Sequence, residues 1–367
     1  MAQGISSFET KEDSVYYNIN MVNNSLTSVR AQFSQSLSSN IVENSNDYYL
    51  SCIRFVLDGA GLPIFIFKNN TGAPMTVQYG YWITLSYGGF SYSYNLSFTN
   101  SNPFFPNGIY NYGKFIDIIN AGFVSAFTSL GGLVILPVDS AAPYMIYNSP
   151  TQLVSLYADA NYLETAMNQI TIYFNNTLYD FFNNMREQIF GEGLANHKDY
   201  RLLVQDLYGS NSAPLDPSIP TGFYKMTQEY PSLFRWYDWS NIAFKSNLLG
   251  IRPEYSQGVN TSTTSLVSNQ SAGSGIPFTS QITDFSIDLT PGDPSAWRGT
   301  LYYTPSAQYR LLDIVKQDTN QIDLSIYIVD KQGNEYPFLI VPESNATVKL
   351  IFVKKSLYKN YKSDGKK

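Results

Sequence analysis

The sequence predicts an all-β protein, a single jelly-roll β-sandwich with long loop insertions and one or two short helices. Short runs that alternate apolar and polar residues recur along most of the chain, and this is the signature of half-buried strands. Glycine, proline and asparagine separate these runs, as in "DGAG" and "YGGF". No strand–helix–strand rhythm and no repeat of fixed length is present, which favours a sandwich or barrel.

The earliest strand signal is "SVYYNINMV" at 14–22, within a polar N-terminal region. From residue 48 onward the signals are dense, and we expect strands in ten runs: 48–57, 62–68, 75–87, 91–98, 152–159, 234–247, 282–289, 299–304, 309–315 and 347–355. Each is rich in β-branched and aromatic residues and bounded by turn residues.

Two segments have helical spacing instead. In 112–132 the apolar residues repeat at intervals of three and four, and Gly131–Gly132 ends the run. Segment 169–191 reads as a strand that passes into a helix. Its stripe consists of Leu178, Phe181, Phe182, Met185 and Ile189. Packing of a helix against a sheet explains both stripes.

The clearest hairpin is "QIDLSIYIVDKQGNEYPFLIV", from Gln321 to Val341. A turn around Gly333 and Asn334 separates its two strands. We expect one face to line the interior, and this face carries Ile322, Leu324, Ile326 and Ile328. The other face should form a wall that solvent or a neighbouring subunit covers, and it carries Asp323, Ser325 and Tyr327.

Strand signals continue to residue 355 without a linker, so we expect one domain. The predicted division is an extended N-terminal arm at 1–40, a jelly-roll domain at 41–356 and a basic tail at 357–367. Insertions are expected at about 105–230 and 256–280. The stretch 256–275 is low-complexity Ser, Thr, Asn and Gly, too polar to bury.

Composition indicates a surface with few charges. Charged residues make up 14% of the 367 residues, against about 25% in an average globular protein. Aromatic residues reach 16%, with 30 tyrosines, and tyrosine suits both strands and wet interfaces. Either other proteins cover this surface or the chain is an ordinary all-β domain, and composition leaves both open. The net charge is −6, so the chain lacks the overall positive charge typical of nucleic-acid-binding proteins.

The chain shows no sign of secretion. Cys52 is the single cysteine, so no disulfide can form within the chain. The first residues have no apolar core of the kind a signal peptide needs, and no long apolar run follows. We therefore expect synthesis in the cytosol, no secretion and no membrane span.

The sequence predicts that the protein is not an enzyme and has no catalytic, cofactor-binding or metal-binding residues. The single histidine, His197, lies in a polar loop, where we expect it to be exposed. One histidine and one cysteine exclude most zinc sites and nucleophile–histidine mechanisms. Two carboxylate pairs, Asp284 with Asp288 and Asp313 with Asp323, could in principle serve a glycosidase. Alternating strands place acids on one face routinely, however, and "DLTPGDPSAW" at 288–297 lacks an EF-hand pattern.

Two clusters are candidate contact sites. The stretch "FRWYDW" supplies Phe234, Arg235, Trp236, Tyr237 and Trp239, which could stack on glycans or bases, anchor an interface, or lie in the core. The tail supplies Lys359, Lys362, Lys366 and Lys367. These lysines are either a solvated terminus or a contact with nucleic acid or an acidic neighbour.

Several segments, taken in order, resemble the minor capsid (penton) proteins of virophages and of polinton-like or adintovirus-like viruses. The resemblance covers most of 46–355. It rests on several segments that occur in the same order as in the family, because no single motif is specific. The matching segments are "NDYYLSCIRFVLDGAGLPIFIF", "YGKFIDIINAGFVSAF", "YNSPTQLVSLYAD", "ITIYFNNTLYDFF", "WSNIAFKSNLLGIRPEY", "ITDFSIDL" and the final run from "YRLLDI" to "LIFVKK".

This resemblance implies a structural protein of the virion that forms homopentamers at the fivefold vertices of an icosahedral double-stranded DNA virus. Double-jelly-roll major capsid protein trimers around the vertex would be its partners, and the N-terminal arm would reach beneath them. No cofactor or catalytic residue comes with the family. The alternatives are a virion attachment or lectin-like jelly roll that binds host glycans and, more weakly, a β-sandwich glycoside hydrolase.

Overall fold

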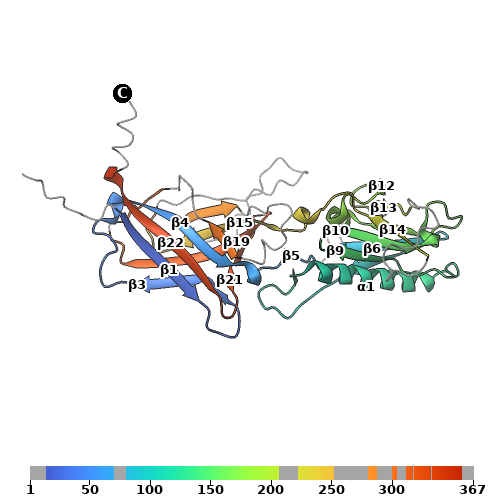
Figure 1. The fold of residues 1–367 in the computed structure, drawn as a ribbon, viewed down its shortest axis with the longest axis horizontal. Helices are drawn as coiled ribbons and strands as arrows, with labels where there is room; N and C mark the ends of the chain where they lie inside the picture. The colour runs from blue at the N-terminus through green and yellow to red at the C-terminus, as the bar shows by residue number, and fades with distance from the viewer. Residues whose placement is uncertain are drawn as a thin grey trace, which may run out of the picture. The chain divides into compact units, whose positions relative to one another are not determined.

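The computed structural model describes residues 14–69, 80–205, 222–251, 280–286, 300–303, 311–316, 318–331 and 333–357 (Figure 1). The chain divides into two compact units. The first, here called the sandwich unit, combines Met1–Leu62 with Trp239–Lys367. The second, the inserted unit, is Pro63–Asp238.

The sandwich unit is built from short strands of both chain segments. They are β1 (Ser14–Val22), β2 (Val29–Arg30), β3 (Gln32–Ser36), β4 (Tyr48–Asp58), β15 (Trp239–Ser246), β16 (Ser280–Ser286), β17 (Thr300–Tyr303), β18 (Leu312–Asp313), β19 (Gln321–Asp330), β20 (Glu335–Pro337), β21 (Leu339–Ile340) and β22 (Asn345–Lys354). Nearly all lie in two five-stranded sheets, whereas β2 and β21 pair with each other.

The two sheets have the orders β1-β22-β4-β17, with β18 also paired to β4, and β16-β15-β19-β20, with β3 also paired to β19. All of these pairings are antiparallel. The chain alternates between the sheets, since β3 and β4, then β16 and β17, then β18 and β19 lie in different ones. Repeated crossing of this kind is typical of a jelly roll, and the predicted fold class is confirmed.

Aromatic rings join the two sheets in the core. Phe55 of β4 lies 5.2 Å from Phe244 of β15 and 4.9 Å from Phe285 of β16, measured between ring centroids. Phe244 and Phe285 are 5.5 Å apart in an edge-to-face arrangement. Such pairs contribute about 0.5–1.5 kcal/mol beyond their burial, so these rings fix the two sheets against each other.

The hairpin predicted at 321–341 is confirmed. Ile322, Leu324, Ile326 and Ile328 are all buried. Gly333 takes a positive φ of 84° in the turn, and Asp330 closes it by accepting hydrogen bonds from the amides of Gly333 and Asn334. The second strand is shorter than expected, because only β20 pairs with β19 and β21 pairs with β2 instead.

Part of the predicted N-terminal arm belongs to the sandwich. β1 pairs with β22 along its whole length, and β3 pairs with β19. Ile19 and Ala31 are buried. The strand expected at 14–22 is present as β1. The arm predicted over 1–40 is not a separate segment along 14–36, because its strands pair with strands more than 280 positions away.

The inserted unit combines strands with one long helix. Its elements are β5 (Phe65–Ile66), β6 (Tyr81–Tyr87), β7 (Phe90–Leu96), β8 (Gly108–Ile109), α1 (Tyr112–Gly131), β9 (Tyr144–Asn148), β10 (Leu153–Asp159), β11 (Thr171–Phe174), α2 (Asn176–Tyr179), β12 (Glu187–Ile189), β13 (Tyr200–Leu202) and β14 (Phe223–Thr227). They form a five-stranded sheet β12-β13-β11-β6-β7, a three-stranded sheet β14-β10-β9 and the pair β5-β8.

Helix α1 confirms the first predicted helix and packs against the five-stranded sheet. The side chain of Asn111 caps its start by accepting from the amide of Gly113. Gly122 allows the close approach, because a Cβ there would lie 2.2 Å from a methyl carbon of Leu96 and 3.1 Å from one of Ile83. Phe123 of α1 packs 6.0 Å from Phe174 of β11.

The second predicted helix is mostly wrong. Only the single turn α2 forms, followed by a 3-10 turn at Asp180–Phe182. Residues 187–189 are the edge strand β12, where Ile189 is exposed. The apolar spacing of Phe181, Phe182 and Met185 is satisfied equally by this compact turn, since all three are buried.

The inserted unit is larger than the insertion expected at about 105–230, and it has a core of its own. A hydrogen bond links its two ends: the amide of Ile66, near the start of the unit, donates to the carboxylate of Asp238, its last residue, at 2.9 Å. Within the single domain expected at 41–356, the chain forms two compact units. The insertion expected at 256–280 lies outside the described residues, apart from Ser280.

Asp323, expected on the outer wall, has a structural role instead. It is buried, and its carboxylate accepts from the hydroxyl of Ser246 and from the amides of Asn247 and Leu248, both at 2.9 Å. These bonds hold the chain where β15 ends. Ser325 and Tyr327 on the same face are half-buried.

We predict that Asp323→Ala lowers the free energy of unfolding by about 1–3 kcal/mol, because the buried hydroxyl of Ser246 and two part-buried amides lose their acceptor. Urea denaturation measures this change. Asp284→Ala is the matched control. It removes an exposed carboxylate that accepts from Asn241 and should change stability by less than about 0.5 kcal/mol. Equal losses in the two variants would contradict the structural role of Asp323.

Candidate functional site

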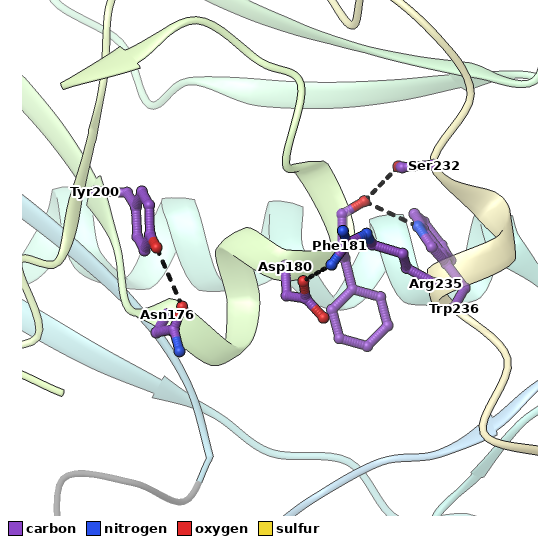
Figure 2. Close-up of polar contacts among 7 residues, drawn as sticks. All are labelled: Asn176, Asp180, Phe181, Tyr200, Ser232, Arg235 and Trp236. Carbon is purple, nitrogen blue, oxygen red and sulfur yellow. Dashed lines mark hydrogen bonds and ion pairs between the residues drawn. The ribbon is translucent and has the colours of Figure 1, made fainter. Parts of the chain in front are cut away.

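The aromatic stretch 234–239 forms a buried anchor of the inserted unit. A 3-10 turn at Leu233–Arg235 positions Trp236, of which only 1% is exposed. The indole Nε1 of Trp236 donates to the carbonyl of Phe181 at 3.0 Å, and the hydroxyl of Ser232 donates to the same oxygen at 2.6 Å (Figure 2). Both polar groups are therefore satisfied inside the core.

The ring of Trp236 lies among other rings of the same unit. Its neighbours are Phe115 at 5.1 Å, Tyr112 at 5.4 Å, and Phe181 and Phe182 at 5.6 Å between centroids. Tyr112 and Phe115 belong to α1, so Trp236 joins the end of the inserted unit to its helix. Edge-to-face contacts of this kind are the preferred geometry of aromatic clusters.

The other members of the predicted cluster do not gather at one surface. Tyr237 is buried, with its hydroxyl bonded to that of Tyr112, and burial raises the pKa of Tyr237. Trp239 belongs to the sandwich unit, where its ring is buried 5.6 Å from that of Tyr336. The side chain of Phe234 is outside the described part of the structure.

Among the described side chains of the stretch, Arg235 is the exposed one. Its guanidinium forms an ion pair with Asp180 at 2.5 Å, and Figure 2 shows this pair beside Phe181 and Trp236. Three interpretations were open for 234–239: stacking on a ligand, an interface anchor and the core. The three described rings, Trp236, Tyr237 and Trp239, are packed inside the chain, which favours the core.

The prediction that His197 is exposed is wrong, because the residue is buried. Its ring stacks on that of Trp82, with the centroids 3.9 Å apart and the planes 4° from parallel. The Nδ1 atom is buried and, among the described residues, has no hydrogen-bond partner. Burial lowers the pKa of His197, and the nearby carboxylate of Asp199 opposes this shift.

The loop that carries His197 is held over the outer face of β6 and β7. The buried carboxylate of Asp199 accepts from the amides of Asn176 and Leu194, both at 2.8 Å, and of Gly193 at 3.2 Å. The carbonyl of Asn196 accepts from Ser93 of β7 at 3.4 Å. These hydrogen bonds hold the loop against the sheet, and His197 is buried as a result.

The carboxylates considered for a glycosidase do not form a described pair. Asp313 forms an ion pair with Lys355 at 3.0 Å, and the Asp323 carboxylate accepts from backbone amides that follow β15. Asp284 is exposed and accepts from Asn241 at 2.9 Å, whereas Asp288 and the acidic stretch 288–297 lie outside the described residues. Within the part of the chain that the structure covers, no three His, Cys, Asp or Glu side chains gather as a metal-binding group.

Two further expectations concern the rest of the chain. Lys359, Lys362, Lys366 and Lys367 of the predicted tail contact site, and the stretch 256–275, are outside the described ranges. Across the residues that are described, no helix combines the length and hydropathy that crossing a membrane requires.

Several apolar side chains of the inserted unit are exposed. Val124 of α1 and three residues of the segment that follows the helix, Leu133, Ile135 and Val138, point into solvent. We call these four residues the α1 face. No motif marked them in the sequence, although the run from 118 to 138 contains no charged residue.

A sandwich of two five-stranded sheets with repeated crossings is the architecture of jelly-roll proteins, a class that includes many viral capsid subunits. The model of the family described as Sputnik minor capsid protein V18/19 matches residues 15–354. The chain belongs to this family of virophage structural proteins, and the resemblance noted in the sequence is confirmed.

Individual relatives agree with this assignment. The chain is 32% identical over 218 residues to structural protein V19 of Sputnik virophage, and the match covers 58% of this chain and 94% of that protein. It superimposes with a TM-score of 0.74 on a chain of the Sputnik virophage cryo-EM structure, at 28% identity and over 94% and 99% of the two chains. The mavirus penton protein shares the fold, with a TM-score of 0.65, 16% identity and coverage of 93% and 99%.

We predict that Trp236→Ala lowers the free energy of unfolding by about 3–5 kcal/mol, because it empties the centre of an aromatic cluster. Arg235→Ala, one residue away, removes a half-exposed ion pair and should cost less than about 1 kcal/mol. Denaturant unfolding followed by tryptophan fluorescence or circular dichroism compares the two. A larger loss in Arg235→Ala would contradict the core role of Trp236.

We also predict that stability falls as the pH drops below about 6.5, the value for histidine in an unfolded chain. His197 has a lowered pKa in the folded protein, so the unfolded state takes up the proton first and protonation favours unfolding. The difference in unfolding free energy between about pH 7 and about pH 5.5 should be smaller in His197→Gln, which cannot titrate. Identical pH profiles for the two proteins would contradict this linkage.

Proposed function

We propose that this chain is a penton protein, a non-enzymatic structural subunit that forms homopentamers and closes the fivefold vertices of an icosahedral double-stranded DNA virus capsid. The observation that carries the proposal is membership in a minor capsid family over residues 15–354. The shared fold with the mavirus penton protein supports it.

The composition of the chain is consistent with this role. A closed ring of identical subunits uses two different side surfaces of each copy. Such interfaces are enriched in tyrosine and depleted in charge at their centres, and the chain has 30 tyrosines and only 14% charged residues. Its expected neighbours at the vertex are double-jelly-roll major capsid protein trimers.

An attachment protein that binds host glycans was the main alternative. It depended on stacking by the rings of 234–239, and Trp236, Tyr237 and Trp239 are buried in the chain. No other described feature favours glycan binding over assembly. We therefore infer that the protein acts in the virion, after synthesis in the host cytoplasm.

We predict that the purified full-length protein assembles into a pentamer. Native mass spectrometry or sedimentation should find a species of about five times the chain mass of 41.3 kDa, in equilibrium with the monomer. A stable monomer or trimer at all concentrations, together with binding to a glycan array, would overturn the proposal in favour of attachment.

A contact of the basic tail with the genome stays a prediction. Truncation after Ser356 removes the lysines of the tail, and a loss of DNA binding that depends on salt is the expected result. Unchanged assembly and genome packaging in the truncated protein would rule out this contact.

A further inference from the structure

The segment 193–198, here called the His197 loop, covers the face of the five-stranded sheet that is turned away from α1. Ile83 of β6 packs on α1, and side chains alternate between the two faces of a strand. Trp82 and Thr84, the neighbours of Ile83, therefore lie on the loop side. Both are buried, and the ring of His197 lies directly on that of Trp82. The loop thus shields this face from water.

The hydrogen bonds that hold the middle of the His197 loop on the sheet are weak. The hydroxyl of Thr84 donates to the carbonyl of His197 at 3.5 Å. The hydroxyl of Ser93 donates to the carbonyl of Asn196 at 3.4 Å. Both distances exceed the usual range of about 2.5–3.0 Å for a hydroxyl donor. Lys198 donates to a serine of β7 at 2.6 Å, but this bond is exposed, so water competes for both groups. The ring stack is therefore the main buried contact in the middle of the loop.

The base of the loop, in contrast, is held firmly. The carboxylate of Asp199 accepts from the amides of Gly193 and Leu194, where the loop begins. It also accepts from the amide of Asn176 in α2. The amide of Phe190 donates to the carbonyl of Asp199 at 2.8 Å. A loop with a fixed base and a weakly bound middle can lift from the sheet while the strands keep their partners.

The backbone of His197 has a conformation that costs free energy. Its φ is +56°, in the left-handed region that few residues other than glycine adopt, although histidine tolerates it better than most. Such a conformation persists only where surrounding contacts hold it. Here the holding contact is the stack on Trp82, with the ring centroids 3.9 Å apart and the planes 4° from parallel. Lifting of the loop would release this strain.

The closed loop suits only the neutral form of the His197 ring. A neutral imidazole carries one proton and a charged imidazole carries two, so both nitrogens of the charged ring are donors. Nδ1 is buried and has no hydrogen-bond partner in the described part of the chain. Asn95 of β7 is paired with Trp82, but its side-chain oxygen is itself buried without a partner, so it does not serve Nδ1. A second proton would therefore create a buried donor without an acceptor, which favours the open loop.

The ionisable groups around the ring balance in charge. The loop and its flanks carry Glu192, Lys198 and Asp199. On the sheet, Arg201 of β13 lies opposite Tyr173 of β11. Two cations and two carboxylates are thus present, and the Asp199 carboxylate is occupied by backbone amides. The side chains that β6 and β7 present on this face do not titrate; they are Trp82, Thr84, Ser86, Ser91, Ser93 and Asn95. The response of the loop to acid therefore rests on the imidazole itself.

We propose that the His197 loop is an acid-sensitive latch. When His197 takes up a proton, the loop lifts from the sheet, Nδ1 reaches water, and Trp82 becomes accessible while the strands stay paired. The opening is local, so it precedes any loss of global stability on acidification. It requires no assembly and is independent of the proposed penton role. The latch gives the subunit one surface at neutral pH and another in an acidic compartment.

Hydroxyl-radical footprinting of the full-length protein tests the latch, because mass spectrometry reads the oxidation of each tryptophan separately. Between about pH 7.5 and about pH 5.5, the oxidation rate of Trp82 should rise about three- to tenfold. Tenfold is the ceiling for one proton that binds to an open loop with a histidine pKa of about 6.5. Trp236 is the internal control, since it is buried in the aromatic core of the same unit, and its rate should not change.

Two variants assign the response to His197. His197→Phe keeps an aromatic ring that can lie on Trp82 but does not titrate, so the oxidation of Trp82 should stay low at both pH values. His197→Asn removes the ring, and asparagine tolerates the left-handed backbone, so the oxidation of Trp82 should be high at both. Thermal unfolding near neutral pH checks that both variants fold.

Four results would overturn the latch. A rate of Trp82 oxidation in the wild type that stays the same or falls in acid shows that the loop does not open. A parallel rise for Trp236 shows global unfolding instead. An acid response in His197→Phe equal to that of the wild type assigns the opening to another group. Protection of Trp82 in His197→Asn shows that the ring stack does not hold the loop.

Discussion

Burial of one complete face of β19 is the constraint on which the sandwich unit depends. The strand pairs with β15, β20 and β3, so its position sets the register of most of its sheet. Its isoleucines and leucine alternate with polar residues, and a slip by one residue would expose all of them. The register between β19 and β15 also fixes the position of Phe244 in β15. Phe244 packs on Phe55 of β4, so this register also determines how the two sheets pack.

The inserted unit depends on a different interaction, the docking of its helix and of Trp236 into one aromatic cluster. Phe115 of α1 touches Phe65, Phe181 and Trp236, which come from the start, the middle and the end of the unit. Rings that are needed to hold these segments together are not available for ligands. Any partner of the inserted unit must therefore bind its solvent-exposed surface, and the shape and low charge of that surface should determine binding more than reactive groups do.

The sequence predicted those elements whose signal is local. The alternation in β19 and the spacing of Ile116, Ile119 and Phe123 in α1 identified a strand and a helix close to their true bounds. Where the deciding contact is distant, the prediction failed. The pairing of β1 with β22 joins the two ends of the chain, and His197 is buried only because the fold brings it onto Trp82.

The candidate sites were harder to predict for the same reason. The composition of "FRWYDW" suits a binding surface as well as a core. Only contacts with distant residues, the carbonyl of Phe181 and the rings of α1, show that Trp236 belongs to the core. The α1 face left a weak but readable signal in the sequence, the uncharged run between Asp117 and Asp139.

The hydrogen bond between Ile66 and Asp238 has a consequence for how such proteins diversify. A unit whose first and last residues meet can be spliced into a loop of a host domain, or removed from it, without leaving a gap to bridge. Recombination could then replace Pro63–Asp238 as a cassette while the strands of the host domain keep their pairing. Lineages with this architecture would be free to change the inserted unit far faster than the sandwich unit.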